Sequence, residues 1–218
     1  ASATIASKAM REARRRLARS RIARKAGSSA SPIRPRLRNC GSETRSDARV
    51  VASAHDEGTL FVSQSGLRND DFAPYVCRST DFGATWTNIT NQFYDAAGKP
   101  KAGLKGDIIP YDRWVKRVVP SAFDENTAYV AFSGYRTHGE DRTWLFVTKD
   151  LGKTWTDISG GMNNPIFDVE EDPDNANVLY LGTDNGVWVS VDQGKTWTAF
   201  STSQPTMVIR DLAIQRRR

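Results

Sequence analysis

Histidine, cysteine and long apolar runs are scarce in this sequence, and each scarcity excludes a class of protein. The 218 residues contain two histidines, His55 and His138, which excludes a metal site built from several histidines. The two cysteines, Cys40 and Cys77, lie in different segments and match no metal-ligand spacing. A disulfide between them is compatible with the sequence, but we interpret Cys77 as a small apolar residue in a strand. The sequence therefore predicts no metal site and no cofactor.

Membrane spans, targeting segments and nucleotide-binding motifs are also missing. No apolar run approaches the roughly 20 residues that a membrane-spanning helix requires. The N-terminus lacks the apolar core of a secretory signal peptide. The sequence has no Gly-rich phosphate loop and no nucleophile motif. Because the first residue is Ala1 rather than methionine, we expect a processed, trimmed or partial product.

Positive charge is concentrated near the N-terminus. Residues 1–49 hold 14 Lys and Arg against 3 Asp and Glu, whereas residues 50–218 hold 17 against 22. A basic segment thus precedes a mildly acidic body, although the formal net charge of the whole chain is +6. Residues 1–26 are rich in Ala and Arg and contain neither Gly nor Pro, which predicts a basic helical arm. Residues 27–48 are expected to form a linker.

Several interpretations of the arm stay open. Clustered arginines neutralise phosphate groups, so the arm could dock on nucleic acid or on another anionic surface such as a membrane. Arg- and Ser-rich sequence that is poor in acids is also typical of an organelle transit peptide. A helix docking on a partner is the third possibility. A solvated tail, or a misassigned gene start, would leave the arm without a specific role. Residues 215–218 form a short basic tail.

The body of the chain repeats itself. The stretch Arg49–Thr59 recurs 68 positions later as Arg117–Thr127, and a more diverged copy begins at Phe167. Each copy leads into a short β-rich segment and then into one signature, Ser/Thr-x-Asp-x-Gly-x-Thr-Trp. The key signature residues are Asp81, Gly83 and Trp86, then Asp150, Gly152 and Trp155, and finally Asp192, Gly194 and Trp197.

The signature has the chemistry of a tight turn. An aspartate carboxylate accepts hydrogen bonds from backbone N–H groups a few residues further on. Glycine adopts the positive φ that other residues resist, and tryptophan buries a large ring against its neighbours. Every part of the signature serves folding, so we interpret the aspartates as structural and predict no catalytic residue among them.

Each repeat is expected to form four short antiparallel strands. In the second and third repeats the expected strands cover residues 116–121, 128–133, 144–148, 154–158, 166–170, 178–182, 187–190 and 196–200. Four strands repeated every ~40–50 residues are typical of propeller blades. The apolar stretch Met207–Ile214 predicts the first strand of a fourth blade. The predicted fold is therefore all-β, with three β-propeller blades plus one strand in an incomplete ring, behind the helical arm.

The body, residues 49–214, resembles the Asp-box (BNR) repeat propellers, a superfamily with sialidases, xyloglucanases and sortilin-type receptors. It resembles in particular the bacterial sortilin-like repeat proteins that are often labelled "glycosyl hydrolase". Leu181–Gly194 and Pro205–Ile214 carry this resemblance. It implies a secreted or periplasmic protein. It implies no activity, because the signature occurs in enzymes and binding proteins alike.

A ring of three blades is incomplete. Propellers close with about 4–8 blades, and a strand without neighbours leaves unpaired edge groups. Either another chain completes the ring, or the sequence is a fragment of a larger propeller. Two copies that form one six-bladed ring are the most specific version of the first alternative.

Two stretches, residues 64–74 and 91–114, interrupt the blades and are expected on a rim, where propeller scaffolds carry function. A third loop, residues 134–142, joins two strands of the second blade. Within the first, residues 66–71 offer oxygen side chains for a hard cation but lack the spacing of a calcium loop. The possible ligand rim comprises Tyr111, Asp112, Trp114, Tyr135, Arg136, Glu140 and Arg142.

Two kinds of chemistry are compatible with these residues. Sialidases use a Tyr/Glu pair and an arginine cluster, and the loop with Tyr135 and Glu140 holds the same residue types. The sialidase arginine motif near the first blade is missing, however, so a polar loop with local ion pairs is the better interpretation. Tyr111 and Trp114, with nearby acids such as Asp107, suit either sugar stacking or an anchored loop.

The sequence thus predicts a non-catalytic binding or scaffold module that recognises a protein or a glycan through its rim loops. The alternative is a sialidase-like or other glycoside hydrolase whose site needs missing blades or a partner chain. Such an enzyme gathers two carboxylates within about 5–10 Å of each other in one pocket. A binding module instead presents an exposed aromatic or charged rim.

Overall fold

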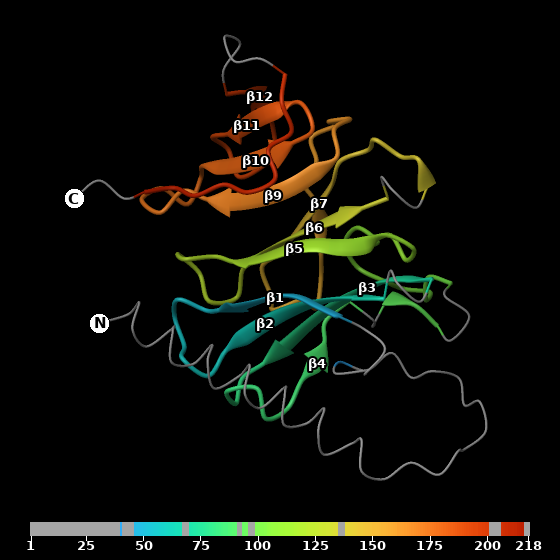
Figure 1. Ribbon diagram of the computed structural model, residues 1–218. Coiled ribbons are helices and arrows are strands. Elements are labelled where there is room, and N and C mark those ends of the chain that lie inside the picture. Colours follow the sequence, from blue (N-terminus) through green and yellow to red (C-terminus); the bar gives the residue numbers. More distant parts are fainter. Residues whose placement is uncertain are drawn as a thin grey trace.

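Three antiparallel sheets make up the described part of the protein (Figure 1). The computed structural model describes residues 40, 46–66, 70–90, 93–95, 99–134, 138–200 and 206–215. Each sheet has four strands in chain order, so each is a meander. The predicted all-β fold of incomplete propeller blades is confirmed. The predicted helical arm, and the basic tail beyond Gln215, lie outside the described residues.

The blades follow one another along the chain. Blade 1 consists of β1 (Ser46–Ala52), β2 (Leu60–Gly66), β3 (Asp71–Ser79) and β4 (Thr87–Asn88). Blade 2 consists of β5 (Trp114–Pro120), β6 (Ala128–Ser133), β7 (Trp144–Thr148) and β8 (Thr156–Asp157). Blade 3 consists of β9 (Ile166–Glu171), β10 (Leu179–Thr183), β11 (Gly186–Ser190) and β12 (Thr198–Ala199). The first strands of blades 2 and 3 pack on the blade before them, since β5 contacts β2 and β9 contacts β6.

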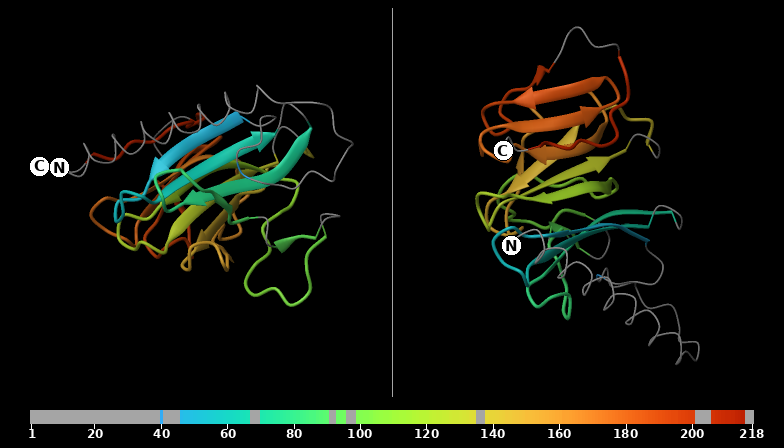
Figure 2. Two further views of the ribbon diagram at one scale, coloured as in Figure 1. Left: turned by 90° about the horizontal axis from the view of Figure 1, so that it is seen from below. Right: turned by 60° about the vertical axis from the view of Figure 1, so that its left-hand side comes forward.

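The three sheets are stacked, so a blade in the middle is covered on both faces (Figure 2). We call the face toward the following blade the leading face and the face toward the preceding blade the trailing face. The strand register assigns residues to each. In blade 2 the leading face carries Tyr129, Ala131, Leu145, Val147 and Ile158, and the trailing face carries Val118, Ala128, Val130, Phe146 and Trp155.

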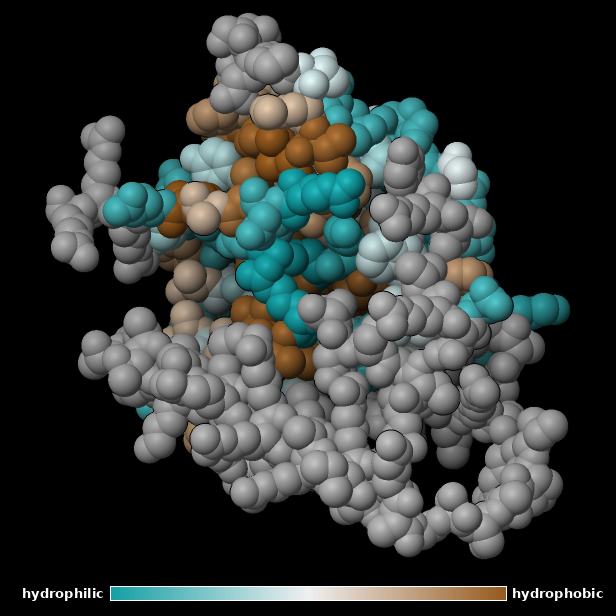
Figure 3. All heavy atoms as spheres, in the orientation of Figure 1, coloured by the Kyte–Doolittle hydropathy of each residue, from teal (hydrophilic) through white to brown (hydrophobic). Residues whose placement is uncertain are grey.

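Two hydrophobic clusters fill the spaces between blades. In the first, Phe61, Val76 and Ile89 of the leading face of blade 1 pack against the trailing face of blade 2. In the second, the leading face of blade 2 packs against the trailing face of blade 3, which includes Leu179 and Leu181. The matching leading face of blade 3 is only partly buried, and hydrophobic surface is visible over that blade in Figure 3.

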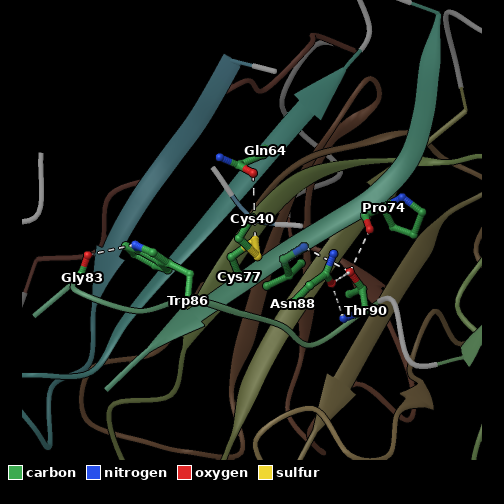
Figure 4. Close-up of a disulfide and its surroundings, with 9 residues drawn as sticks. Cys40, Gln64, Pro74, Cys77, Gly83, Trp86, Asn88 and Thr90 are labelled. Atoms are coloured by element: carbon green, nitrogen blue, oxygen red, sulfur yellow. Dashed lines mark hydrogen bonds between the residues drawn. A yellow bond between two sulfur atoms is a disulfide. The ribbon is translucent and has the colours of Figure 1, made fainter. Parts of the chain in front are cut away.

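A third cluster covers the trailing face of blade 1 and contains a disulfide. Val50, Val62 and Cys77 are buried there, with Cys40 and Trp86 packed against them. Cys40 and Cys77 are bonded, with their Cα atoms 6.0 Å apart (Figure 4). The interpretation of Cys77 as a plain apolar strand residue was therefore wrong. Its register places the side chain on the trailing face, where it meets Cys40 across 37 residues of sequence.

The three signature turns have the same geometry. In the first, the Asp81 carboxylate accepts hydrogen bonds from the Thr85 N–H (2.8 Å) and hydroxyl (2.7 Å) and from the Ser79 hydroxyl (2.8 Å). The bonds from Thr85 lower the pKa of Asp81 to about 2. Asp150 and Asp192 accept the same three bonds in the other two turns. The glycine of each signature has a φ between +84° and +90°.

The antiparallel order separates the two ends of the blades. The signature turns follow the third strand of each blade and lie at one end. Residues 70, 110–113, 134 and 138–143 lie at the opposite end, which we call the rim end. Residues 206–215 form no regular strand, in contrast to the predicted fourth-blade strand. Their backbone hydrogen-bonds to the backbone of the β10–β11 hairpin at two points, from Ile209 N to Thr183 O (2.8 Å) and from Gly186 N to Met207 O (2.9 Å).

Candidate functional site

Arg113, which directly precedes β5, gathers polar side chains at the rim end. Its Nε donates to Glu140 Oε2, and its Nη1 lies 2.6 Å from Asp112 Oδ1. His138 Nε2 lies 3.3 Å from the second oxygen of Asp112. A Cβ at Gly134 would lie 2.6 Å from Arg113 Nε, so only glycine admits this pairing beside the end of β6. We call these residues, Asp112, Arg113, His138 and Glu140, the Arg113 cluster.

Trp144, the first residue of β7, connects the Arg113 cluster to a second group. The Arg142 guanidinium lies 3.9 Å from the centre of the Trp144 ring and the Arg113 guanidinium 6.0 Å from it. Arg142 Nη2 is also 3.6 Å from Asp157 Oδ2. A guanidinium this close to an indole ring gains a cation–π interaction, which holds Arg142 over the ring.

A hollow of about 460 Å³ opens beside Arg142. It is lined by Arg142, Asp157, Ser159, Gly160, Gly161, Met162 and Asn163. Asp157 supplies the one carboxylate of this lining, and its Oδ1 accepts the Ser159 N–H at 2.8 Å. The hollow therefore offers hydrogen-bond donors, hydrogen-bond acceptors and a guanidinium. Its lining lacks the two carboxylates that glycoside hydrolysis requires.

The predicted rim residues do not form one site. Asp112, Glu140 and Arg142 come together around Arg113 and Trp144, as described above. Tyr111 packs edge-on against Tyr94, with ring centres 4.9 Å apart, and is partly buried against the first hydrophobic cluster. Trp114 lies instead beside Lys116, whose Nζ is 5.2 Å from the ring centre. Tyr135 and Arg136 lie outside the described residues.

Asp107 has a structural contact as well. Its backbone N–H donates to Trp155 O at 2.8 Å, and its carboxylate accepts the Asp157 N–H at 2.7 Å. Asp107 thereby pairs with the outer edge of blade 2 at β8. These bonds satisfy edge groups that would otherwise face solvent.

A charged network between blades 2 and 3 escaped the sequence analysis. The Arg117 side chain, on β5, contacts Asp168 Oδ1 (2.6 Å), Glu170 Oε1 (2.7 Å) and Asp211 Oδ1 (3.4 Å). Burial raises the pKa of Asp168 to about 7, although the Leu212 N–H and Arg117 oppose this shift. Arg117, Asp168 and Asp211 hold matching positions in successive repeats, and aligning those positions would have revealed the network.

No metal site emerges from these groups. Within the described residues, no set of three or more His, Cys, Asp or Glu side chains is placed to hold a metal ion. In the loop considered for a cation, Asp71 accepts a hydrogen bond from the Tyr75 hydroxyl at 2.9 Å. In the same part of the chain, no helix is long and apolar enough to cross a membrane.

No protein-family model and no curated protein sequence matches this chain. Among solved structures, it is similar to the GH74 enzyme of Niastella koreensis, with a TM-score of 0.50 and 18% identity over 72% of this chain and 22% of the enzyme. An ancestral GH74 enzyme gives a TM-score of 0.48 and 14% identity, over 72% and 19% of the two chains. YCF48 from Cyanidioschyzon merolae gives 0.45 and 16%, over 72% and 42%.

The similarity to the Niastella koreensis enzyme supports the propeller-like fold and nothing finer. The chain spans about a fifth of the length of the GH74 structures that it matches. At such low identity a shared fold does not carry an activity from one protein to another. The function has to be argued from the site itself.

Proposed function

We propose that this chain is a non-catalytic binding module built from Asp-box propeller blades, which recognises a protein or a glycan at its rim end. The pairing of the rim carboxylates is the observation that carries this proposal. Asp112 and Glu140 both contact Arg113, and Asp157 lies beside Arg142. Hydrolysis of a glycosidic bond needs one carboxyl group that donates a proton to the leaving oxygen. Carboxylates held by arginines instead suit a fixed recognition surface.

The hollow beside Arg142 is the proposed contact point. Arg142 is half-exposed and is oriented by the Trp144 ring, so its remaining N–H groups can bind a ligand without losing that support. Asn163 and Asp157 add further polar groups at the same place. Such a mixture suits sugar hydroxyls or the backbone and polar side chains of a peptide.

The three signature turns fit the Asp-box assignment in this proposal, since their aspartates only hold local turns. The Cys40–Cys77 disulfide supports a location outside reducing compartments, as the sequence resemblance also implies. Completion of the ring by a further chain, and docking of the basic arm on an anionic surface, are separate parts of the proposal. They do not depend on the rim end.

Binding of the purified chain to a printed glycan array and to a peptide array tests the proposal. We expect signal from one class of probe that falls at least about tenfold in Arg142→Ala. Lys195→Ala is the matched control, because this exposed cation lies on the signature turn of blade 3, at the opposite end. Equal loss in both variants would indicate non-specific charge attraction instead.

A hydrolysis assay separates the proposal from its alternative. The chain is incubated with sialosides and with xyloglucan, and released sugar is measured. We expect no release above that of the Glu140→Gln variant. Turnover that disappears in this variant would contradict a non-catalytic role and would favour a glycoside hydrolase.

A further inference from the structure

Residues 206–215, which we call the docked segment, are attached to blade 3 by a small set of contacts. Among the described residues, the backbone of the segment bonds to the backbone of the blade at Thr183 and Gly186. A further backbone group, the Leu212 N–H, donates to a side chain instead, the carboxylate of Asp168, with Oδ2 at 2.7 Å. A segment attached in this way opens more easily than a strand in a full ladder of hydrogen bonds. Its attachment can therefore depend on the state of one carboxylate.

The carboxylate of Asp168 faces a second carboxylate in the docked segment. Asp168 of β9 and Asp211 of the segment repeat the position that Arg117 holds in β5. Between blades 2 and 3 this repetition pairs opposite charges, since Arg117 meets Asp168. At the next boundary it brings two acids together, because Asp211 reaches the same guanidinium, with Oδ1 3.4 Å from Nη1. Two carboxylates placed together favour the state in which one of them carries a proton.

The charges around Asp168 strengthen this preference. One cation and three carboxylates form what we call the Arg117 network: Arg117, Asp168, Glu170 and Asp211. Negative charge is in excess in this network, and protonation of Asp168 reduces the excess. Two further cations of the same elements lie over the Phe167 ring, with Lys116 Nζ 5.1 Å and the Arg210 guanidinium 5.5 Å from its centre. Opposite Asp168, β10 contributes the uncharged Gly182.

Docking of the segment is coupled to protonation of Asp168. The side chain is fully buried, with Arg117 Nε 2.6 Å from Oδ1 and the Leu212 N–H on Oδ2. Burial raises the pKa of Asp168 to about 7, although the Leu212 N–H and Arg117 favour its charged form. Release of the segment would admit water to the carboxylate, and its pKa would fall toward the ordinary value of 3.8. Docking therefore favours the uptake of a proton.

We propose that the Arg117 network is a pH-sensitive clasp, which holds residues 206–215 against blade 3 when Asp168 is protonated and loosens them when it is ionised. Ionisation adds a negative charge beside Asp211, whose side chain is 79% exposed and can turn toward solvent. Because Asp211 and Leu212 are neighbours in the chain, this movement also strains the Leu212 bond. The docked state has the higher pKa, so the clasp is closed at low pH and opens as the pH rises toward 7 and above.

Hydrogen exchange of the full oxidised chain, measured by NMR between about pH 5 and 8, tests this proposal. The reporter is the Ile209 amide, which donates to Thr183 O and is protected while the segment is docked. Its protection factor compares the observed exchange rate with the intrinsic rate at the same pH, which removes the direct effect of pH on exchange. We expect this factor to fall at least about fivefold over the range. A constant factor in the natural chain would overturn the proposal.

Two variants assign the effect to Asp168. Asp168→Asn keeps an acceptor for the Leu212 N–H but cannot ionise, so the Ile209 protection factor should change by less than about twofold over the same range. Asp174→Asn is the matched control, because this exposed carboxylate lies between β9 and β10, outside the Arg117 network. It should retain the full pH dependence. An equal fall in Asp168→Asn and in the natural chain would assign the effect to another group and reject the clasp.

Urea at low concentration separates opening of the segment from unfolding of the whole chain. Local opening exposes little surface, so the protection of Ile209 should be insensitive to urea up to about 1 M. Amides of the central strand β6 report global unfolding, and their protection should fall with urea. If Ile209 lost protection in step with β6, the chain would open as a whole, and a local clasp would be excluded. These measurements do not involve a rim-end ligand, so this proposal and the proposed function can fail separately.

Discussion

Arg117 of β5 and Asp168 of β9 hold the same position in successive blades, and their side chains meet across the boundary, with Nε 2.6 Å from Oδ1. Asp168 is fully buried and Arg117 nearly so. Glu170 and Asp211 approach the same guanidinium, so one cation faces three carboxylates. This network joins two blades and the C-terminal segment, and it has consequences for stability that can be measured.

The protonation of Asp168 should make stability depend on pH. Its pKa of about 7 in the folded chain lies above the ordinary value of 3.8 that applies after unfolding. Between these two values the folded chain binds one proton more than the unfolded chain. The contribution of Asp168 to the free energy of unfolding is therefore present at low pH and is lost as pH rises toward 7.

Asp168→Asn removes this titration. We expect the difference in unfolding free energy between the natural chain and the variant to fall by about 2–4 kcal/mol as pH rises from about 4 to 7. Urea unfolding followed by tryptophan fluorescence at several pH values measures it. Other titrating groups change the free energy of unfolding equally in both chains, so their effect cancels in the difference. One such group is Asp192, whose pKa the Thr196 hydroxyl and N–H lower to about 2, and whose contribution to stability changes with pH in the opposite direction. If the unfolding free energies of the two chains changed in parallel with pH, the raised pKa of Asp168 would be contradicted.

Replacement of the central cation should be costly at neutral pH. Arg117→Met leaves buried Asp168 beside two further carboxylates without a counter-charge, and we expect a loss of about 3–5 kcal/mol. Lys116→Met is the matched control, because this neighbouring lysine contacts the rings of Trp114 and Phe167. Its loss should cost about 1 kcal/mol or less. The double variant Arg117→Met/Asp168→Asn should recover part of the loss, and an additive result would exclude direct coupling.

The second signature turn should tolerate no side chain at its glycine. Gly152 has a φ of +90°, and a Cβ there would lie 2.6 Å from the Ile89 Cβ of blade 1. Gly152→Ala therefore combines backbone strain with a clash between blades, and we expect a loss of about 3 kcal/mol or more. Gly103→Ala is the control, since Gly103 has a φ of +76° with nothing within 4 Å. It should cost about 1 kcal/mol, and equal losses would show that the clash is unimportant.

The disulfide should contribute substantially to stability. Its two cysteines are 37 residues apart, and closing a loop of this length in the unfolded chain corresponds to roughly 3–4 kcal/mol. We expect Cys40→Ser/Cys77→Ser to lose about this amount in urea unfolding. Adding dithiothreitol should destabilise the natural chain and leave the variant unchanged. If dithiothreitol left the unfolding free energy of the natural chain unchanged, the disulfide would contribute little to stability.

Features within one repeat were predictable, because each depends on residues close together in the chain. Continuous apolar runs and the signature turn give the strands at 128–133 and 144–148 their observed bounds. The outermost strands are shorter than expected, since β8 and β12 each keep two residues. Residues of the fourth strand of a blade form ladder hydrogen bonds only where the third strand lies close enough. Local strand propensity does not indicate how far apart these two strands lie.

The sequence by itself determined the number of blades, their four-strand order and the turns that join their third and fourth strands. Only the tertiary structure decided which side chains meet between segments. It brought Asp112 and Glu140 to Arg113, packed Tyr111 against the first hydrophobic cluster and bonded Cys40 to Cys77. Periodicity specifies the face on which a side chain lies, whereas its partner depends on how neighbouring blades and loops pack, and these come from distant parts of the chain.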